Sequence, residues 1–379
     1  MKIAILTLTL NHNYGAGLQA FALSEFLKSL GHEVVIMNIC RQKFEKMFDV
    51  KFGWKRKVYI FGTNIIKYCL NYWQKGSFHL TESILRQQLA FMDFYVQYTC
   101  HTRKYYTDEA IKEDLPIADL YIVGSDQVWN PINTDNRLYT FYCSFLPDNI
   151  KRISYAASFG GNKQLNLSAE QILIIKQLLQ KFSAISVRED IGIDVLKETF
   201  GIDNGVEVLD PTFLPDVSVY EKIAKTSKIN GQGYIFSFMF NTNKKWFKSL
   251  KYISRQTGYK VRTDRSTTKF RGFLYNPVLP VQDWLKLIKT AEFIWTDSFH
   301  CMVFCILFHK EFVVTPSYTG GEGRIISLLK KIGLENRFFY NSDDVAKSNI
   351  WNEKIDYLKV DDKLRDLKIK AREFLVKQL

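Results

Sequence analysis

The stretch that decides how this sequence folds is FIWTDSFHCMVFCILFHK, residues 293–310. Its first four residues are apolar and predict a buried strand over residues 293–296. Asp297 and Ser298 follow, and both residue types favour the position that caps a helix N-terminus. The apolar run of residues 299–308 then predicts two or three turns of buried helix. A strand, a polar turn and a helix form half of a βαβ unit, in which ligands bind against the helix N-terminus.

His300 falls in the first turn of this expected helix, where its side chain can face such a ligand. A histidine in that place can act as a general acid or base near neutral pH. It could equally be a core histidine whose ring nitrogens are satisfied. Position alone does not separate the two interpretations.

Length and composition are those of a globular protein with two domains. The chain has 379 residues, of which 46% are hydrophobic and 24% charged, and this length is long for a single domain. The net charge of +13 favours anionic partners such as phosphorylated substrates or an anionic membrane surface. We expect no nucleic-acid partner, because no recognisable readout motif accompanies the charge.

The cysteines and the hydropathy favour a cytoplasmic protein without a metal site. The six cysteines are scattered without C-x-x-C spacing and no secretory signal opens the chain, which predicts reduced thiols. Cys301, Cys305 and His309 are spaced four apart, so the outer two would lie about 12 Å apart on a helix and cannot share one metal. The best membrane-span candidate, residues 58–70, is short and carries Lys67, so no transmembrane helix is expected.

Residues 1–215 are predicted to form a Rossmann-like domain. A strand at residues 2–10, a polar glycine-containing turn and a helix at residues 18–30 make a βα start. The turn is not G-x-G-x-x-G, so no dinucleotide site is predicted. Further strands are expected at residues 33–39, 119–123, 152–158, 184–187 and 206–209, with helices at 168–182 and 191–200.

Residues 41–114 interrupt this order with a basic, aromatic segment in which helices and few strands are expected. Such an amphipathic, positively charged insertion could lie on a membrane surface or contact an anionic acceptor. A helical cap on the first domain is the alternative.

Residues 216–355 are predicted to form a second Rossmann-like domain, and residues 356–379 a basic helix that packs back across both domains. If the carboxyl edges of both sheets face one cleft, the polar turns that follow their strands converge there. Strands are expected at residues 234–240, 293–296 and 312–315. One helix is expected between the first of these strands and about residue 258, and two more are expected at residues 283–290 and 324–332. The turns lie around Asn13, Asp126, Ser158, Arg188, His300 and Glu322.

Several residues of these turns have chemistry suited to an anionic ligand and a polar acceptor. Arg188 and Arg324 are candidate clamps for phosphate or carboxylate, since guanidinium pairs with both in bidentate geometry, although either could be a surface residue. Asp126 could accept a proton from a hydroxyl or only bind it. Trp129 could stack on a sugar ring or lie in the core.

Seven segments spread over nearly the whole chain carry a resemblance to a known family. Each is weak alone, but their order and spacing are specific, and together they resemble the polysaccharide pyruvyl transferases. The segments are NYGAGLQA (13–20), VGSDQVWNP (123–131), SYAASFG (154–160), SVRED (186–190), LDPT (209–212), DWL (283–285) and TDSFH (296–300).

The resemblance implies an α/β fold of two Rossmann-like domains facing a cleft, like that of the glycosyltransferase-B (GT-B) enzymes. It implies phosphoenolpyruvate as donor and co-substrate, no further cofactor, and a pyruvate ketal as product. The ketal would form on a sugar of an exopolysaccharide or capsule, or on its lipid-linked precursor. The histidine matching His300 is then the general acid. One departure is Ser298, where many members carry an arginine, and Arg324 is our first choice of substitute.

On this interpretation the donor side is formed by Arg188, Ser298, Glu322 and Arg324. The acceptor side is formed by Asn13, Tyr14, Gly15, Asp126, Gln127 and Trp129. Two alternatives stay open. The chain could be a nucleotide-sugar glycosyltransferase on the same fold, with Glu322 on the ribose. It could also be a non-catalytic binder of sugar or lipid head groups at the inner membrane face.

Overall fold

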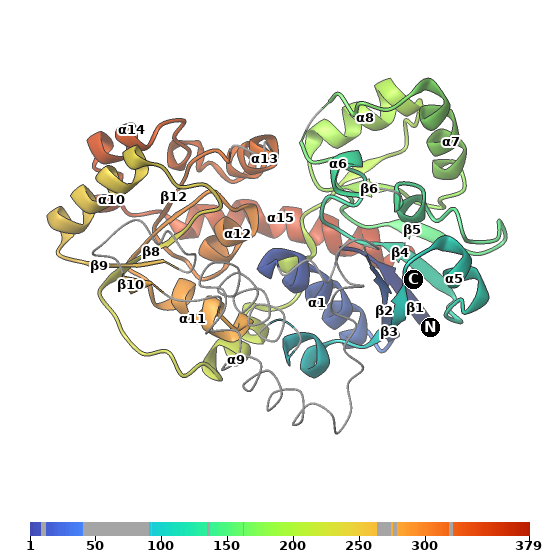
Figure 1. Cartoon of the computed structure of the whole chain (residues 1–379), viewed down its shortest axis with the longest axis horizontal. Helices are drawn as coiled ribbons and strands as arrows, with labels where there is room; N and C mark the ends of the chain where they lie inside the picture. The colour runs from blue at the N-terminus through green and yellow to red at the C-terminus, as the bar shows by residue number, and fades with distance from the viewer. Residues whose placement is uncertain are drawn as a thin grey trace, which may run out of the picture.

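The computed structural model describes residues 1–8, 13–40, 91, 93–134, 137–161, 163–263, 274–275, 279–317 and 321–379. These residues form two α/β lobes side by side, and the long helix α15 (Tyr357–Val376) runs from one lobe to the other (Figure 1). Both chain termini lie at the first lobe. No helix among the described residues is long and apolar enough to cross a membrane.

The first lobe is built on a parallel sheet with strand order β3-β2-β1-β4-β5. The short strands β6 and β7 continue it beyond β5, because the backbone N–H of Ser154 donates to Ala184 and that of Ala157 donates to Ser186. The strands are β1 (Lys2–Leu6), β2 (Glu33–Ile39), β3 (His101–Tyr105), β4 (Leu120–Val123), β5 (Arg152–Ser154), β6 (Ser186–Val187) and β7 (Val206–Glu207).

The second lobe has a parallel sheet with strand order β10-β9-β8-β11-β12. Its strands are β8 (Tyr234–Phe238), β9 (Lys260–Thr263), β10 (Leu274–Tyr275), β11 (Phe293–Thr296) and β12 (Phe312–Val314). In both sheets the strand order reverses direction beside a central strand, the arrangement that places ligand sites at the carboxyl edge.

Helices cover both sheets, and most begin at a side chain that caps the first turn. Ser168 makes a reciprocal capping box with Gln171 at the start of α7, and Asn243 caps α10. The helices are α1 (Tyr14–Ser29), α5 (Asp108–Glu113), α6 (Pro131–Thr134), α7 (Ala169–Leu179), α8 (Asp190–Phe200), α9 (Val217–Lys225), α10 (Lys244–Thr257), α11 (Val281–Thr290), α12 (Phe299–Leu307), α13 (Glu322–Ile332) and α14 (Ser342–Ser348).

Several expected element bounds differ from the structure, and two of them differ for clear local reasons. The helix expected from residue 18 begins at Tyr14, because Asn13 caps it by accepting a bond from the N–H of Gly15. The strand expected over 152–158 ends at Ser154, since Ala156 has a positive φ of 53° that breaks extended geometry. In the described part of the basic segment 41–114, residues 93–98 and α5 are helical as expected, and β3 between them pairs in parallel with β2. Residues 41–90 and 92 lie outside the described residues.

Alternating side chains divide each sheet between an outer core and a core that both lobes share. In β1, Ile3 and Ile5 belong to the shared cluster, whereas Ala4 and Leu6 face the outer core of the first lobe. The shared cluster also takes in buried side chains of α1, α11, α12 and α15. The two lobes are therefore joined by a continuous hydrophobic cluster, and α1 and α12 lie against one another at its centre (Figure 1).

Candidate active site

The β11–α12 connection has the predicted bounds and is held by its two polar residues. Ser298 Oγ accepts the backbone N–H of Cys301 at 3.4 Å and caps α12. The Asp297 carboxylate accepts two backbone N–H groups from the turn after β8, one of them from Phe240 at 2.7 Å. These bonds fix the first turn of α12 at the carboxyl edge of the sheet. Ser298 therefore caps the helix, and unlike an arginine at this position it brings no charge to a bound substrate.

His300 lies where the N-terminal turns of α1 and α12 meet. Its side chain is buried, and a Cβ atom on Gly15 would stand 2.0 Å from its Nδ1 atom, so only glycine allows α1 to approach this closely. The Nε2 atom lies 3.4 Å from Oδ2 of Asp210. It has no hydrogen-bond partner among the described residues, so Nε2 is the ring atom that a ligand could engage.

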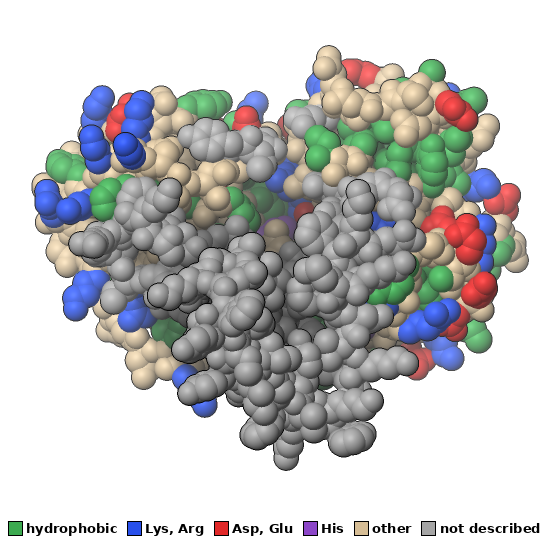
Figure 2. Space-filling view, viewed as in Figure 1, with side chains coloured by type: hydrophobic (Ala, Val, Ile, Leu, Met, Phe, Trp, Pro, Cys, Tyr) green, Lys and Arg blue, Asp and Glu red, His purple; other side chains and the backbone are tan. Residues whose placement is uncertain are grey.

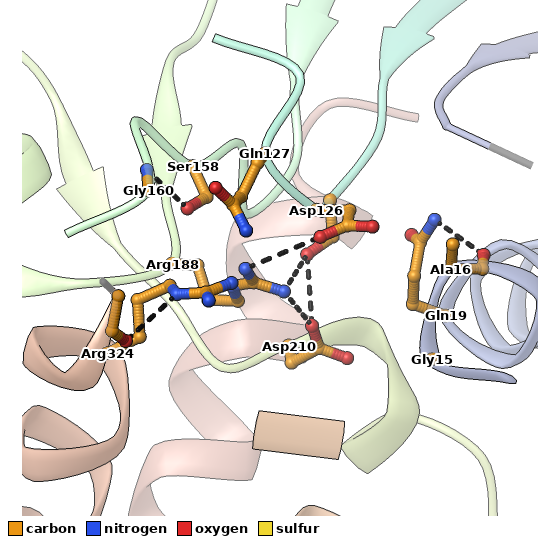
Figure 3. Close-up of polar contacts among 12 residues, drawn as sticks. Gly15, Ala16, Gln19, Asp126, Gln127, Ser158, Gly160, Arg188, Asp210 and Arg324 are labelled. Atoms are coloured by element: carbon orange, nitrogen blue, oxygen red, sulfur yellow. Dashed lines mark hydrogen bonds and ion pairs between the residues drawn. The ribbon is translucent and has the colours of Figure 1, made fainter. Parts of the chain in front are cut away.

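Arg188 contacts Asp210, the neighbour of His300, and Figure 3 shows its guanidinium between the carboxylates of Asp126 and Asp210. Its Nη1 atom lies 2.9 Å from Oδ2 of Asp210, its Nε atom 3.6 Å from Oε2 of Glu189, and its Nη2 atom 3.8 Å from Oδ1 of Asp126. Burial lowers the pKa of Arg188, but the three carboxylates outweigh burial and the net pKa is raised. The guanidinium is therefore a fixed positive charge at the centre of the site.

The carboxyl group of Asp210 is also held in its charged form. Burial raises the pKa of Asp210, but the neighbouring His300 and Arg188 lower it by more than burial raises it. The net pKa therefore lies well below its usual range. Ser125 Oγ donates to Oδ2 at 3.0 Å, and Thr212 donates twice to Oδ1. Asp210 is thus a saturated acceptor that holds the other groups in place.

Arg324 brings a second guanidinium to the same place from the second lobe. The Cζ atoms of Arg188 and Arg324 lie 4.6 Å and 5.7 Å from the ring centroid of Phe299, a cation–π geometry. Burial, and then the charge of Arg188, lower the pKa of Arg324 to about 10. Two guanidinium groups around one ring, one buried and one partly buried, favour an anion between or beside them, because an anion relieves their mutual repulsion.

The turns of the first lobe close the site on the opposite side. Asp126 has a positive φ of 71°, and the side chains of Asp126 and Gln127 lie above Arg188 in Figure 3. Gln127 Oε1 accepts a bond from Asn130 Nδ2 at 2.7 Å. A Cβ on Gly160 would lie 2.3 Å from that Nδ2 atom, so glycine is required for the turn after β5 to pack here.

The start of α13 touches the first lobe through glycine residues. A Cβ on Gly323 would stand 3.2 Å from the carbonyl oxygen of Gly161. Glu322 precedes it, and its Oε2 atom is buried without a hydrogen-bond partner among the described residues. In Figure 2 the surface is notched between the two lobes, and histidine (purple) and Lys or Arg (blue) side chains show at the base of the notch.

Trp129 does not lie in this site, and the prediction that it binds the acceptor is wrong. Its side chain is fully buried, its ring stacks on Tyr142 at 5.3 Å, and its Nε1 donates to the carbonyl of Phe141 at 2.9 Å. The indole belongs to the outer core of the first lobe, which is the core alternative weighed for it above.

Tyr14 is also committed to packing, so the prediction that it contacts the acceptor is wrong. Its ring stacks on Trp284 of the second lobe at 4.8 Å. Its hydroxyl donates to the carbonyl of Leu279 at 2.9 Å and accepts the N–H of the same residue at 3.0 Å. Tyr14 therefore fastens α1 to the second lobe, and Asn13 acts as the cap of α1.

Two residues of the site were missed by sequence reasoning. Asp210 directly contacts both His300 and Arg188. Glu189 is buried and accepts Ser158 Oγ at 2.6 Å. Asp210 follows the last expected strand of the first domain, so the rule that selected Arg188, a polar residue after a strand, could have selected it.

The described residues contain no group of three or more His, Cys, Asp or Glu side chains placed to hold a metal ion. The ionisable groups that meet at the site are instead one histidine, two arginines and several carboxylates. This set can bind an anion, donate a proton and orient a hydroxyl.

Comparison with known proteins agrees with this picture. The family described as "Polysaccharide pyruvyl transferase" matches residues 13–317, which is most of the chain. No curated protein matches the chain.

Solved structures resemble the chain over its whole length. MnaA of S. aureus, solved with UDP, is 12% identical over 100% of this chain and 97% of its own, with a TM-score of 0.52. The UDP-N-acetylglucosamine 2-epimerase from Rickettsia bellii is 10% identical over 99% and 96%, with a TM-score of 0.52. An alpha-glucosyltransferase solved with UDP and a 13-mer DNA is 11% identical over 99% and 95%, with a TM-score of 0.50. At these identities the likeness shows the fold alone, and it confirms the predicted GT-B-like architecture.

Proposed function

The chain belongs to the polysaccharide pyruvyl transferase family, and from that premise we propose that this transferase moves the enolpyruvyl group of phosphoenolpyruvate onto two hydroxyls of one sugar. The product is a pyruvate ketal on a surface polysaccharide or its lipid-linked precursor. The observation that carries the proposal is the buried Nε2 atom of His300, which lacks a hydrogen-bond partner among the described residues and lies beside the Arg188–Asp210 pair.

The donor is bound by the two arginines around Phe299. Phosphoenolpyruvate carries a phosphate and a carboxylate, and guanidinium groups recognise both in bidentate geometry. The Nε and Nη2 atoms of Arg188 have no hydrogen-bond partner among the described residues, since their carboxylate contacts are 3.6 Å and 3.8 Å long. These N–H groups are therefore available to donor oxygens. Arg324 supplies the second charge and takes the place of the arginine that Ser298 replaces.

His300 supplies the proton that starts the reaction. Transfer of the Nε2 proton to the methylene carbon of the donor forms a methyl group and leaves an oxocarbenium-like centre at C2. One sugar hydroxyl adds there and gives up its proton, which restores the imidazolium. The C2–O bond to phosphate then breaks, and a second hydroxyl of the same sugar closes the ketal. The second hydroxyl proton leaves with the phosphate.

The remaining groups orient this chemistry. Oδ2 of Asp210 lies 3.4 Å from Nε2 of His300 and 2.9 Å from Nη1 of Arg188, so its charge acts on the proton donor and on the anion site together. Asp126 and Gln127 lie across Arg188 from this oxygen in Figure 3 and are suited to bind sugar hydroxyls. The acceptor enters from their side.

The test is phosphate release from phosphoenolpyruvate with galactose-, mannosamine- and glucose-type acceptors. We expect acceptor-dependent release from the wild type and a loss of about 100-fold or more in His300→Asn. His309→Asn is the matched control, because His309 is half exposed and has a φ of 52° that asparagine also adopts.

Release by His300→Asn at the wild-type rate would remove the acid role from His300. If no acceptor supports release, calorimetry with phosphoenolpyruvate and with a nucleotide sugar decides between donors. Binding of the nucleotide sugar in preference to phosphoenolpyruvate would overturn the proposal.

A further inference from the structure

A small pocket opens on the side of Arg188 that faces α13 and α15. It shares Arg188, Phe299 and Arg324 with the candidate active site and extends outward to Lys331 of α13 and Lys370 of α15. The pocket is therefore continuous with the place where the donor anion is bound, and it is separate from the cleft side formed by Asp126 and Gln127.

The lining of this pocket carries an excess of positive charge. Its four cationic side chains, Arg188, Arg324, Lys331 and Lys370, face two carboxylates, those of Glu207 and Asp210. Both carboxylates are already engaged, because Glu207 pairs with Lys331, and Asp210 pairs with Arg188. The other lining residues are apolar, and the carboxylates of Glu189 and Asp126 contact Arg188 from outside the pocket lining.

The solvent exposure of the basic side chains increases from the interior end of the pocket to its rim. The side chain of Arg188 is 1% exposed and that of Lys331 is 28% exposed, while Lys370 is exposed at the rim. Burial, together with the charge of Lys370, lowers the pKa of Lys331 although Asp190 raises it. Arg188 also keeps two N–H groups without hydrogen-bond partners among the described residues. A small anion that starts at Arg188 thus finds further cationic groups along the way to the surface.

We propose that this pocket binds the inorganic phosphate that the transfer releases, and that phosphate leaves on the α13–α15 side while the sugar occupies the opposite side. The assignment of the phosphate's source rests on the proposed function, whereas the binding of phosphate itself does not. A compact dianion suits the site because it can accept hydrogen bonds from guanidinium and ammonium groups at once. Exit on this side allows phosphate to depart before the ketal product does.

The test is calorimetric titration of inorganic phosphate into the whole protein without other ligands. Lys331→Met and Lys370→Met remove one charge each and keep an unbranched apolar stem. Lys330→Met and Lys363→Met are matched controls, because both lysines are exposed on the same two helices and lie outside the pocket lining. Lys370→Met leaves the ion pair between Lys331 and Glu207 intact, so it tests the phosphate site even if Lys331→Met folds poorly.

We expect the Kd for phosphate to rise about fivefold or more in each pocket variant, with the controls within about twofold of the wild type. The affinity for phosphoenolpyruvate should change less than that for phosphate, since its main contacts are the two arginines. Equal phosphate affinity in pocket and control variants would overturn the proposal. If phosphate binding depends on Lys331 and Lys370 but this protein shows no pyruvyl transfer, the proposed function is contradicted and the phosphate site is supported.

Discussion

Oδ2 of Asp210 lies 3.4 Å from Nε2 of His300, and this contact joins the loop after β7 in the first lobe to the first turn of α12 in the second. The same oxygen lies 2.9 Å from Nη1 of Arg188. A single carboxylate oxygen thus sets the spacing between the proton donor and the donor-binding guanidinium. The site exists only when the two lobes are docked in this arrangement.

Asp210→Asn should lower kcat by about 100-fold, because a neutral amide no longer compensates the charges of Arg188 and protonated His300 or fixes the ring. The measurement is steady-state phosphate release at saturating donor, with folding checked by circular dichroism. Asp203→Asn, at an exposed position, is the control and should keep wild-type activity. A kcat in Asp210→Asn within twofold of the wild type would show that this contact has no role in turnover.

The same carboxylate should make stability depend on pH at the acid end. The pKa of Asp210 is lowered in the folded protein, so the unfolded chain binds a proton more readily as the pH falls. The contribution of Asp210 is therefore present above the unfolded pKa of about 4 and is lost as the pH falls below it. Urea unfolding of the wild type between pH 7 and pH 3 should show this loss, and Asp210→Asn should show a shallower decline. Parallel declines in the two proteins would contradict the assignment.

Gly15→Ala should impair activity by displacing His300, because the added Cβ would stand 2.0 Å from Nδ1 and neither helix backbone can move freely. We expect kcat to fall about tenfold or more, at a cost of about 1–3 kcal/mol in the free energy of unfolding. Ser24→Ala is the control on the same helix, since Ser24 Oγ is buried without a hydrogen-bond partner among the described residues. Full activity in Gly15→Ala would mean that α1 does not position the imidazole.

Trp129→Phe should weaken the fold and leave acceptor binding unchanged. The substitution removes the indole bond to Phe141 and part of the stacking on Tyr142, which should lower the free energy of unfolding by about 1–3 kcal/mol. The KM for the acceptor should stay within about twofold of the wild type. A large rise in that KM with unchanged stability would restore the sugar-stacking interpretation.

Local rules of the sequence were sufficient for the elements at the heart of the site. The apolar run 293–296, the capping Ser298 and the apolar helix after it predicted β11 and α12 with their N-terminal bounds, and they placed His300 in the first helical turn. Capping and side-chain periodicity act within a few residues, so they can be read without the rest of the chain. Ala156 shows where such local rules fail. Its positive φ ends β5 early, although a residue with positive φ is usually a glycine and none stands at this position.

The tertiary structure decided which of these groups meet. His300 contacts Gly15 and Asp210, which are far away in the chain, and only the docking of the two lobes brings them together. The sequence placed Trp129 and Tyr14 in polar turns, and both were expected to bind the acceptor. Instead Trp129 is buried in the core of the first lobe, and Tyr14 packs at the interface between the lobes. By itself the sequence indicated most strands of the two sheets, several of their helices and the residue types at their ends, but it did not predict β3, β9 or β10. Which side of a turn faces the cleft depends on long-range packing, since burial of apolar area is a property of the assembled core and not of a local pattern.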